Sequence, residues 1–125
     1  MKNLRCIFAL VIVSLAVCIP ETPAQMGAPS FSEVQTIFRA HCTECHGGAR
    51  PPEGLRLGSY RDAMAGGKDG PVIVPGSPEK SELMGRVKGI VKPRMPKDGP
   101  PWLSEKEIAY IEKWIAAGAA ETEAR

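Results

Sequence analysis

Apolar residues recur at helical spacing in two long stretches of this chain, and each stretch opens with a helix-capping signal. Ser30 and Glu33 form a capping-box pattern, and Ser104 and Glu107 repeat it. Gly118 marks the end of the second stretch. Both stretches therefore predict amphipathic helices, the first running up to Cys42. Their apolar faces comprise Val34, Ile37 and Phe38 in the first helix, and Ile108, Ile111, Trp114 and Ile115 in the second.

The chain between these helices is rich in glycine and proline, which limits it to short elements. Capping residues predict a short helix over 59–65, closed by two glycines. Proline at a first helical position predicts another helix from Pro78 to about Gly89, with Leu83, Met84 and Val87 facing inward. The apolar run 72–74 is too short to predict a sheet. We expect an all-α fold of short helices and long loops.

The N-terminus has the pattern of a targeting segment. Lys2 and Arg5 precede an almost wholly apolar run over residues 6–19, and the small residue Ala24 suits a signal peptidase. The pattern predicts a signal peptide over residues 1–24 and export to the periplasm or an equivalent compartment. Because the apolar run is shorter than the ~20 residues that span a bilayer, we expect no stable membrane span after cleavage.

A lipoprotein signal is the alternative reading of this segment. Residues 15–18 resemble a lipobox that ends at Cys18. Val17 fits it poorly, since such boxes need Gly, Ala or Ser at that position. We therefore expect cleavage after Ala24.

The rest of the chain predicts one small domain over residues 30–120, between a flexible leader at 25–29 and a frayed tail at 121–125. A domain of this size commonly depends on a cofactor or cross-links for stability. The formal net charge is only +2, and no dense basic stripe is present. Nucleic acid is therefore not an expected partner.

Residues Cys42-Thr43-Glu44-Cys45-His46 form C-x-x-C-H, the attachment signature of a c-type haem. Two thiols at this spacing can each add to one of the two vinyl groups of a single haem. The histidine after the second thiol is then placed as the proximal iron ligand. The motif predicts one haem c, held covalently through Cys42 and Cys45, with its iron bound by His46.

Two other uses of these cysteines are the alternatives to haem attachment. Cys6 and Cys18 leave with the signal peptide, so an exported domain would keep Cys42 and Cys45 for one disulfide. That disulfide would close a very small loop. A zinc site is the other alternative, but no second ligand pair follows at finger spacing, and zinc does not explain the adjacent His46.

For the second axial position of the iron, the sequence favours Met95 as the ligand. Its loop is flanked by prolines, which prevent a helix and leave an extended thioether free to point inward. Met64 and Met84 lie on predicted helix faces, where methionine usually fills a core, and Met26 lies in the leader. His41 competes as a bis-histidine ligand, but its place next to Cys42 favours a capping or surface role.

Two further groups of residues are candidates for contacts around the haem. The haem propionates need hydrogen-bond donors, for which the candidates are Arg56, Arg61 and Trp102. Trp114, at helical spacing with apolar neighbours, is expected in the core. Four lysines near the Met95 loop are candidates for docking an acidic redox partner, with a solvated surface as the alternative; they are Lys80, Lys88, Lys92 and Lys97.

Taken together, the chain resembles the monohaem class I cytochromes c, and most narrowly the cytochrome c-like domain of many planctomycete proteins. The resemblance implies a covalent haem, His46 and Met95 as axial ligands, and first and last helices that cross. Such domains are usually fused to others of poorly understood role, so only the haem chemistry is carried over. The narrower resemblance rests on Gly54-Leu55-Arg56-Leu57 with Gly66-Gly67, Ile73-Val74-Pro75-Gly76-Ser77-Pro78, Ser81-Glu82-Leu83 and Arg94-Met95-Pro96.

These features predict an electron carrier rather than an enzyme, since no paired carboxylates or activated nucleophile stand out. The expected partners are redox proteins or a respiratory or dehydrogenase complex. A haem-based ligand sensor or a peroxidase-like enzyme is the alternative, and it requires a sixth ligand that is absent or readily displaced. A third hypothesis is an interaction domain without haem.

Overall fold

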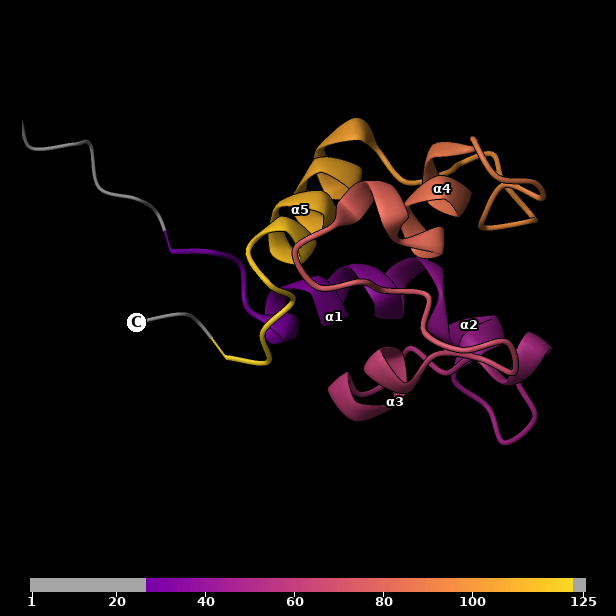
Figure 1. Ribbon diagram of the computed structural model, residues 1–125. Coiled ribbons are helices and arrows are strands. Elements are labelled where there is room, and N and C mark those ends of the chain that lie inside the picture. Colours follow the sequence, from indigo (N-terminus) through magenta and orange to yellow (C-terminus); the bar gives the residue numbers. More distant parts are fainter. Residues whose placement is uncertain (1–26, 123–125) are drawn as a thin grey trace, which may run out of the picture.

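The computed structural model describes residues 27–122, which form an all-α fold as predicted (Figure 1). Short 3₁₀ turns lie at Pro52–Gly54 and Pro78–Lys80, and an isolated bridge joins Gly67 to Gly70. No strand is present between residues 27 and 122. The helices are α1 (Phe31–His41), α2 (Thr43–His46), α3 (Tyr60–Ala65), α4 (Glu82–Lys88) and α5 (Glu105–Ala116).

Several predictions concern residues outside this range. The signal peptide over 1–24, Met26 and the last residues of the frayed tail all lie outside the described residues. Within residues 27–122, no helix has the length and apolar character needed to cross a membrane.

The core lies where α1 packs against α5, with α4 beside α5 and α3 on the other side of α1 (Figure 1). Trp114 is fully buried, and its ring lies 5.8 Å from that of Phe31. The ring of Tyr60, at the start of α3, lies 5.4 Å from Phe31 in an edge-on arrangement. Because aromatic side chains bury large apolar areas, this cluster fixes the two helices against each other. Val34, Phe38, Ile111 and Ile115 complete the interface.

Polar contacts also join the two long helices. The Tyr110 hydroxyl donates to Glu33 at 2.7 Å, and His41 pairs with Glu107 at 2.9 Å. The pKa of Glu107 lies below its usual value, chiefly because it accepts the backbone N–H of Ser104, and further because of His41. Such partly exposed pairs contribute at most about 1 kcal/mol each. They set how the helices align, whereas apolar burial provides most of the stability.

The helix predicted from Pro78 is wrong in one respect, because the chain divides it at Ser81. Residues 78–80 form a 3₁₀ turn, and α4 begins only at Glu82. Ser81 is buried with extended backbone, and its hydroxyl donates to Ser77 O at 3.0 Å while accepting from Val74 N–H at 2.9 Å. These bonds satisfy the buried polar groups and pull Ser81 out of helical geometry.

Backbone hydrogen bonds join the loops between α2 and α4 to α2 and to each other. Leu57 N–H donates to His46 O at 2.8 Å, and Lys68 N–H donates to Glu53 O at 2.7 Å. Gly66 has a φ of +80°, and a side-chain carbon there would lie 2.1 Å from Gly70 O. Only glycine fits this position. The loops therefore form a defined wall that faces α4.

We expect Ile115→Ala in α5 to lower the free energy of unfolding by about 2–5 kcal/mol, because the side chain is fully buried. Ile90→Ala is the matched control, since Ile90 is 76% exposed and such changes usually stay within about 0.5 kcal/mol. Urea unfolding followed by far-ultraviolet circular dichroism measures both. Equal losses in the two variants would contradict this core.

Candidate functional site

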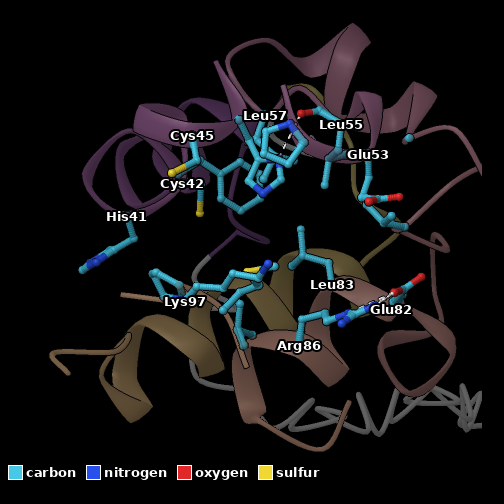
Figure 2. A pocket seen from close by; sticks show the side chains of 18 of the residues that line it. His41, Cys42, Cys45, Glu53, Leu55, Leu57, Glu82, Leu83, Arg86 and Lys97 are labelled. Atoms are coloured by element: carbon cyan, nitrogen blue, oxygen red, sulfur yellow. Dashed lines mark hydrogen bonds and ion pairs between the residues drawn. The ribbon is translucent and has the colours of Figure 1, made fainter. Parts of the chain in front are cut away.

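A cavity of about 520 Å³ opens between the haem-motif side of the fold and the α4–α5 side. This volume lies within the ~300–1,000 Å³ of cofactor and ligand sites. Figure 2 shows Cys42, Cys45, Leu55 and Leu57 on one side of it and Leu83 and Arg86 on the other. The walls are mainly apolar, so they suit a large apolar group; further apolar lining residues are Phe38, Val72, Val87, Leu103 and Ile111.

The C-x-x-C-H segment lies at the C-terminal end of α1, where the chain turns into α2. Cys42 N–H donates to Phe38 O at 2.7 Å and ends α1, and His46 N–H donates back to Cys42 O at 2.8 Å. This compact turn brings Cys42, Cys45 and His46 to the same cavity. Both cysteines are free thiols, so the predicted alternative of a disulfide is not formed in this structure.

The two thiols differ in their surroundings. Cys45 is exposed, whereas Cys42 is half-buried and packs against the core. Burial raises the pKa of the Cys42 thiol to about 12, because an apolar environment disfavours the thiolate. At neutral pH the Cys42 sulfur is therefore an uncharged thiol in the cavity wall.

His46 is oriented by a backbone carbonyl. Its Nδ1 lies 3.1 Å from Leu55 O. Because a carbonyl oxygen only accepts, Nδ1 carries the proton and Nε2 keeps its lone pair. A histidine that ligates a metal through Nε2 needs this tautomer, and such a second partner holds the ring in place. Leu55 thus serves both as an apolar wall and, through its carbonyl, as the residue that orients His46.

Met95 lies on the loop after α4 and is half-buried at the cavity. The other methionines within residues 27–122 do not line it: Met84 is buried in the core, and Met64 packs against that core. Of the predicted methionine candidates in the described chain, the structure thus brings only Met95 to the cavity that His46 lines. The backbone N–H of Met95 donates to Arg86 O at 3.0 Å, which ties its loop to α4.

His41 also lines the cavity, but its Nε2 is paired with Glu107. The prediction of a capping or surface role therefore missed that His41 links α1 to α5 at the cavity edge. No signal in the sequence relates positions 41 and 107.

The predicted propionate donors do not line the cavity. Arg56 donates instead to Gly48 O and Ala49 O, at 3.2 and 2.7 Å, and braces the loop after the motif. Trp102 packs on the Met95 loop, where its Nε1 donates to Pro96 O at 3.1 Å. Arg61 is likewise absent from the lining. The cationic side chains that do line the cavity are Lys68, Arg86 and Lys97.

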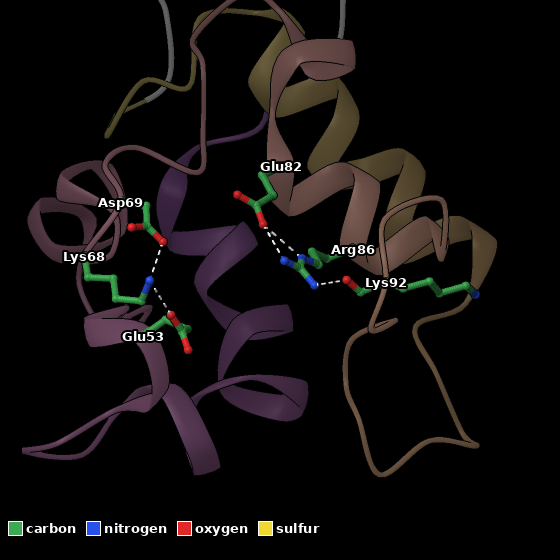
Figure 3. Close-up of polar contacts among 6 residues, drawn as sticks. All are labelled: Glu53, Lys68, Asp69, Glu82, Arg86 and Lys92. Atoms are coloured by element: carbon green, nitrogen blue, oxygen red, sulfur yellow. Dashed lines mark hydrogen bonds and ion pairs between the residues drawn. The ribbon is translucent and has the colours of Figure 1, made fainter.

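Two of these cations are held by carboxylates on opposite sides of the cavity (Figure 3). Lys68 pairs with Asp69 at 2.6 Å and with Glu53 at 3.1 Å. On α4, Arg86 pairs with Glu82 at 2.7 Å. Sequence reasoning assigned none of these residues to the site, because only folding brings the two groups to one rim.

The residues present fit a covalently held haem. The cavity combines two free thiols with a histidine in a ligating tautomer and a methionine thioether, inside apolar walls. The predicted zinc alternative needs three or four convergent ligands. Within residues 27–122, no three His, Cys, Asp or Glu side chains are grouped so as to hold a metal ion.

Comparison with known proteins identifies the part of the chain that forms this cavity. Residues 42–99 match the family model described as Planctomycete cytochrome C. The match spans the haem motif and the Met95 loop but neither α1 nor α5. No curated protein and no solved structure shows a significant match to the chain. The chain therefore contains a cytochrome c-like domain of the type that the planctomycete cytochrome C family describes.

Proposed function

We propose that this protein is an exported c-type cytochrome that carries single electrons through one covalently bound haem, with His46 and Met95 as axial ligands. The observation that best supports this is one apolar-walled cavity lined by Cys42, Cys45, His46 and Met95. The family match over residues 42–99, which includes these four residues, also supports the haem chemistry. Cytochromes c are in general electron carriers rather than enzymes.

In this proposal Cys42 and Cys45 attach the cofactor. Their sulfurs would hold the haem as two thioethers, each arising by addition of the S–H group across one vinyl group. No external oxidant or reductant is consumed. The covalent links leave the short helices and long loops of the domain folded around a group that cannot dissociate in either oxidation state.

His46 and Met95 then set the properties of the centre. Leu55 O fixes the His46 ring and increases the donor strength of Nε2. A methionine thioether in the opposite position raises the reduction potential relative to stronger donors. When bound, the haem iron supplies the one-electron couple between Fe(II) and Fe(III).

The apolar lining residues would exclude water from the centre. Leu57 and Leu83 are buried walls that lower the local dielectric around the centre. The carboxylates of Glu53 and Glu82 at the rim are engaged by Lys68 and Arg86. This arrangement suits outer-sphere electron exchange with a redox protein or a respiratory or dehydrogenase complex in the same compartment.

The decisive test is the optical spectrum of protein made in a host with haem-maturation machinery. We expect sharp bands on reduction and the weak far-red band of iron–methionine ligation on oxidation. Haem bands without the far-red band, or bands shifted readily by CO, would favour a ligand sensor or a peroxidase-like enzyme. A colourless protein would contradict the proposal.

Replacing Met95 by leucine should remove the sixth ligand while preserving side-chain size. We expect loss of the far-red band, CO binding to the reduced protein, and a fall in potential on the order of 0.1 V within the ~0.8 V range that axial ligands span. Met64→Leu is the matched control, because Met64 packs against the core and does not line the cavity. A Met95→Leu protein with the wild-type potential would refute this ligand assignment.

Replacing Cys42 and Cys45 together by serine should abolish covalent attachment. Haem staining after denaturing electrophoresis measures this directly, and the double variant should give no stained band. Each single variant should keep one thioether and remain stained. A stained double variant would show that the haem is attached elsewhere.

A further inference from the structure

The loop that carries Met95 has little apolar anchoring of its own. Ile90 is 76% exposed and Val91 is 37% exposed, so the apolar burial of this segment comes mainly from Val91 against Gly85. Prolines at 93 and 96 remove backbone donors. The position of Met95 therefore depends on specific polar contacts with neighbouring elements.

Arg86 on α4 contacts this loop through both its backbone and its side chain. Its carbonyl oxygen accepts the N–H of Met95 at 3.0 Å. Its guanidinium Nη1 donates to the carbonyl of Lys92, three residues earlier on the same loop (Figure 3). Arg86 thus binds the segment at Lys92 and at Met95, on either side of Pro93.

The guanidinium is itself held in place by Glu82, one helical turn earlier. Nε and Nη2 both donate to Glu82 Oε1, at 3.0 and 2.7 Å. The three N–H donors of the planar guanidinium are thereby directed at two acceptors, Glu82 Oε1 and Lys92 O. A lysine ammonium cannot reproduce this fork, because it is a compact point charge on a flexible stem.

The far side of the loop has a separate brace. The Arg94 guanidinium lies 4.3 Å from the centre of the Trp102 ring, and Trp102 Nε1 donates to Pro96 O at 3.1 Å. Trp102 follows Met95 and leads into α5, whereas Arg86 precedes Met95. The contacts of Arg86 therefore act on the segment that enters Met95 from α4, together with the bond from Val91 N–H to Gly85 O at 2.9 Å.

We propose that Arg86 is a positioning residue, whose guanidinium, oriented by Glu82, holds the segment from Lys92 to Met95 against α4 and so keeps Met95 at the cavity. The proposal rests on the proposed function in treating Met95 as the sixth ligand. It assigns Arg86 a role beyond that of its ion pair, because the partly exposed Arg86–Glu82 pair by itself contributes little stability.

Arg86→Gln tests the proposal, with Lys88→Gln as the matched control. Lys88 lies on the same helix, pairs with Glu112 at 2.6 Å, and has a similar exposure, 32% against 28% for Arg86. Both variants lose one cation and one ion pair, but only Arg86→Gln loses the bond to Lys92 O. Amide hydrogen exchange of the holoprotein by NMR and the thermal persistence of the far-red band are the two measurements.

We expect the Met95 amide to exchange about tenfold faster in Arg86→Gln, since a lost bond to a charged donor loosens the loop by that order. The far-red band should also disappear at a lower temperature. Arg86→Lys should not restore either property, and Lys88→Gln should match the wild type in both. Glu82→Gln should show the same changes to a smaller extent, and it serves if Arg86→Gln does not fold.

A Met95 amide that exchanges at the wild-type rate in Arg86→Gln would overturn the proposal. Faster exchange in that variant would also overturn it if the far-red band persisted to the same temperature as in Lys88→Gln. An equal effect of Lys88→Gln would overturn it too, because general loss of charge would then explain the result. A wild-type protein without the far-red band would refute Met95 ligation instead, and the exchange comparison would still test whether Arg86 holds the loop.

Discussion

The packing of α1 against α5 is the constraint on which the rest of the structure depends. Phe31 and Trp114 fill the space between the two helices, and further apolar side chains close it. The end of α1 continues into the haem motif, while α5 supports α4 and, through it, the Met95 loop. The cavity is thus the space between these two groups of elements. Their relative position is set by a single interface of aromatic and aliphatic side chains.

The two sides of the cavity are built by different physical means. On the side of the motif, consecutive helical turns place Cys42 and His46, and the backbone carbonyl of Leu55 orients the imidazole. On the other side, a loop with exposed apolar residues is held by hydrogen bonds to Arg86. The first side is held by hydrogen bonds within a short stretch of chain, whereas the second depends on a few polar contacts between elements, and such contacts open more readily.

Local signals were sufficient for much of the fold. Both capping boxes, at Ser30 and Ser104, mark the starts of real helices, because a cap is decided by residues three positions apart. The helix predicted from Pro78 was wrong at Ser81, since a hydrogen bond with Val74 from the preceding loop competes there with helical geometry. The predicted propionate donors do not line the cavity, for a similar reason. Arg56 instead donates to backbone carbonyls that lie seven and eight residues before it.

The sequence by itself determined the all-α class, the starts of the two long helices and the haem motif, because each depends on residues that are close along the chain. It also singled out Met95, through the prolines around it. Only the tertiary structure decided that Met64 and Met84 lie away from the cavity, that His41 pairs with Glu107, and that Lys68 and Arg86 border the cavity. These are contacts between distant positions, and they follow from how α1 and α5 pack, which no local pattern encodes.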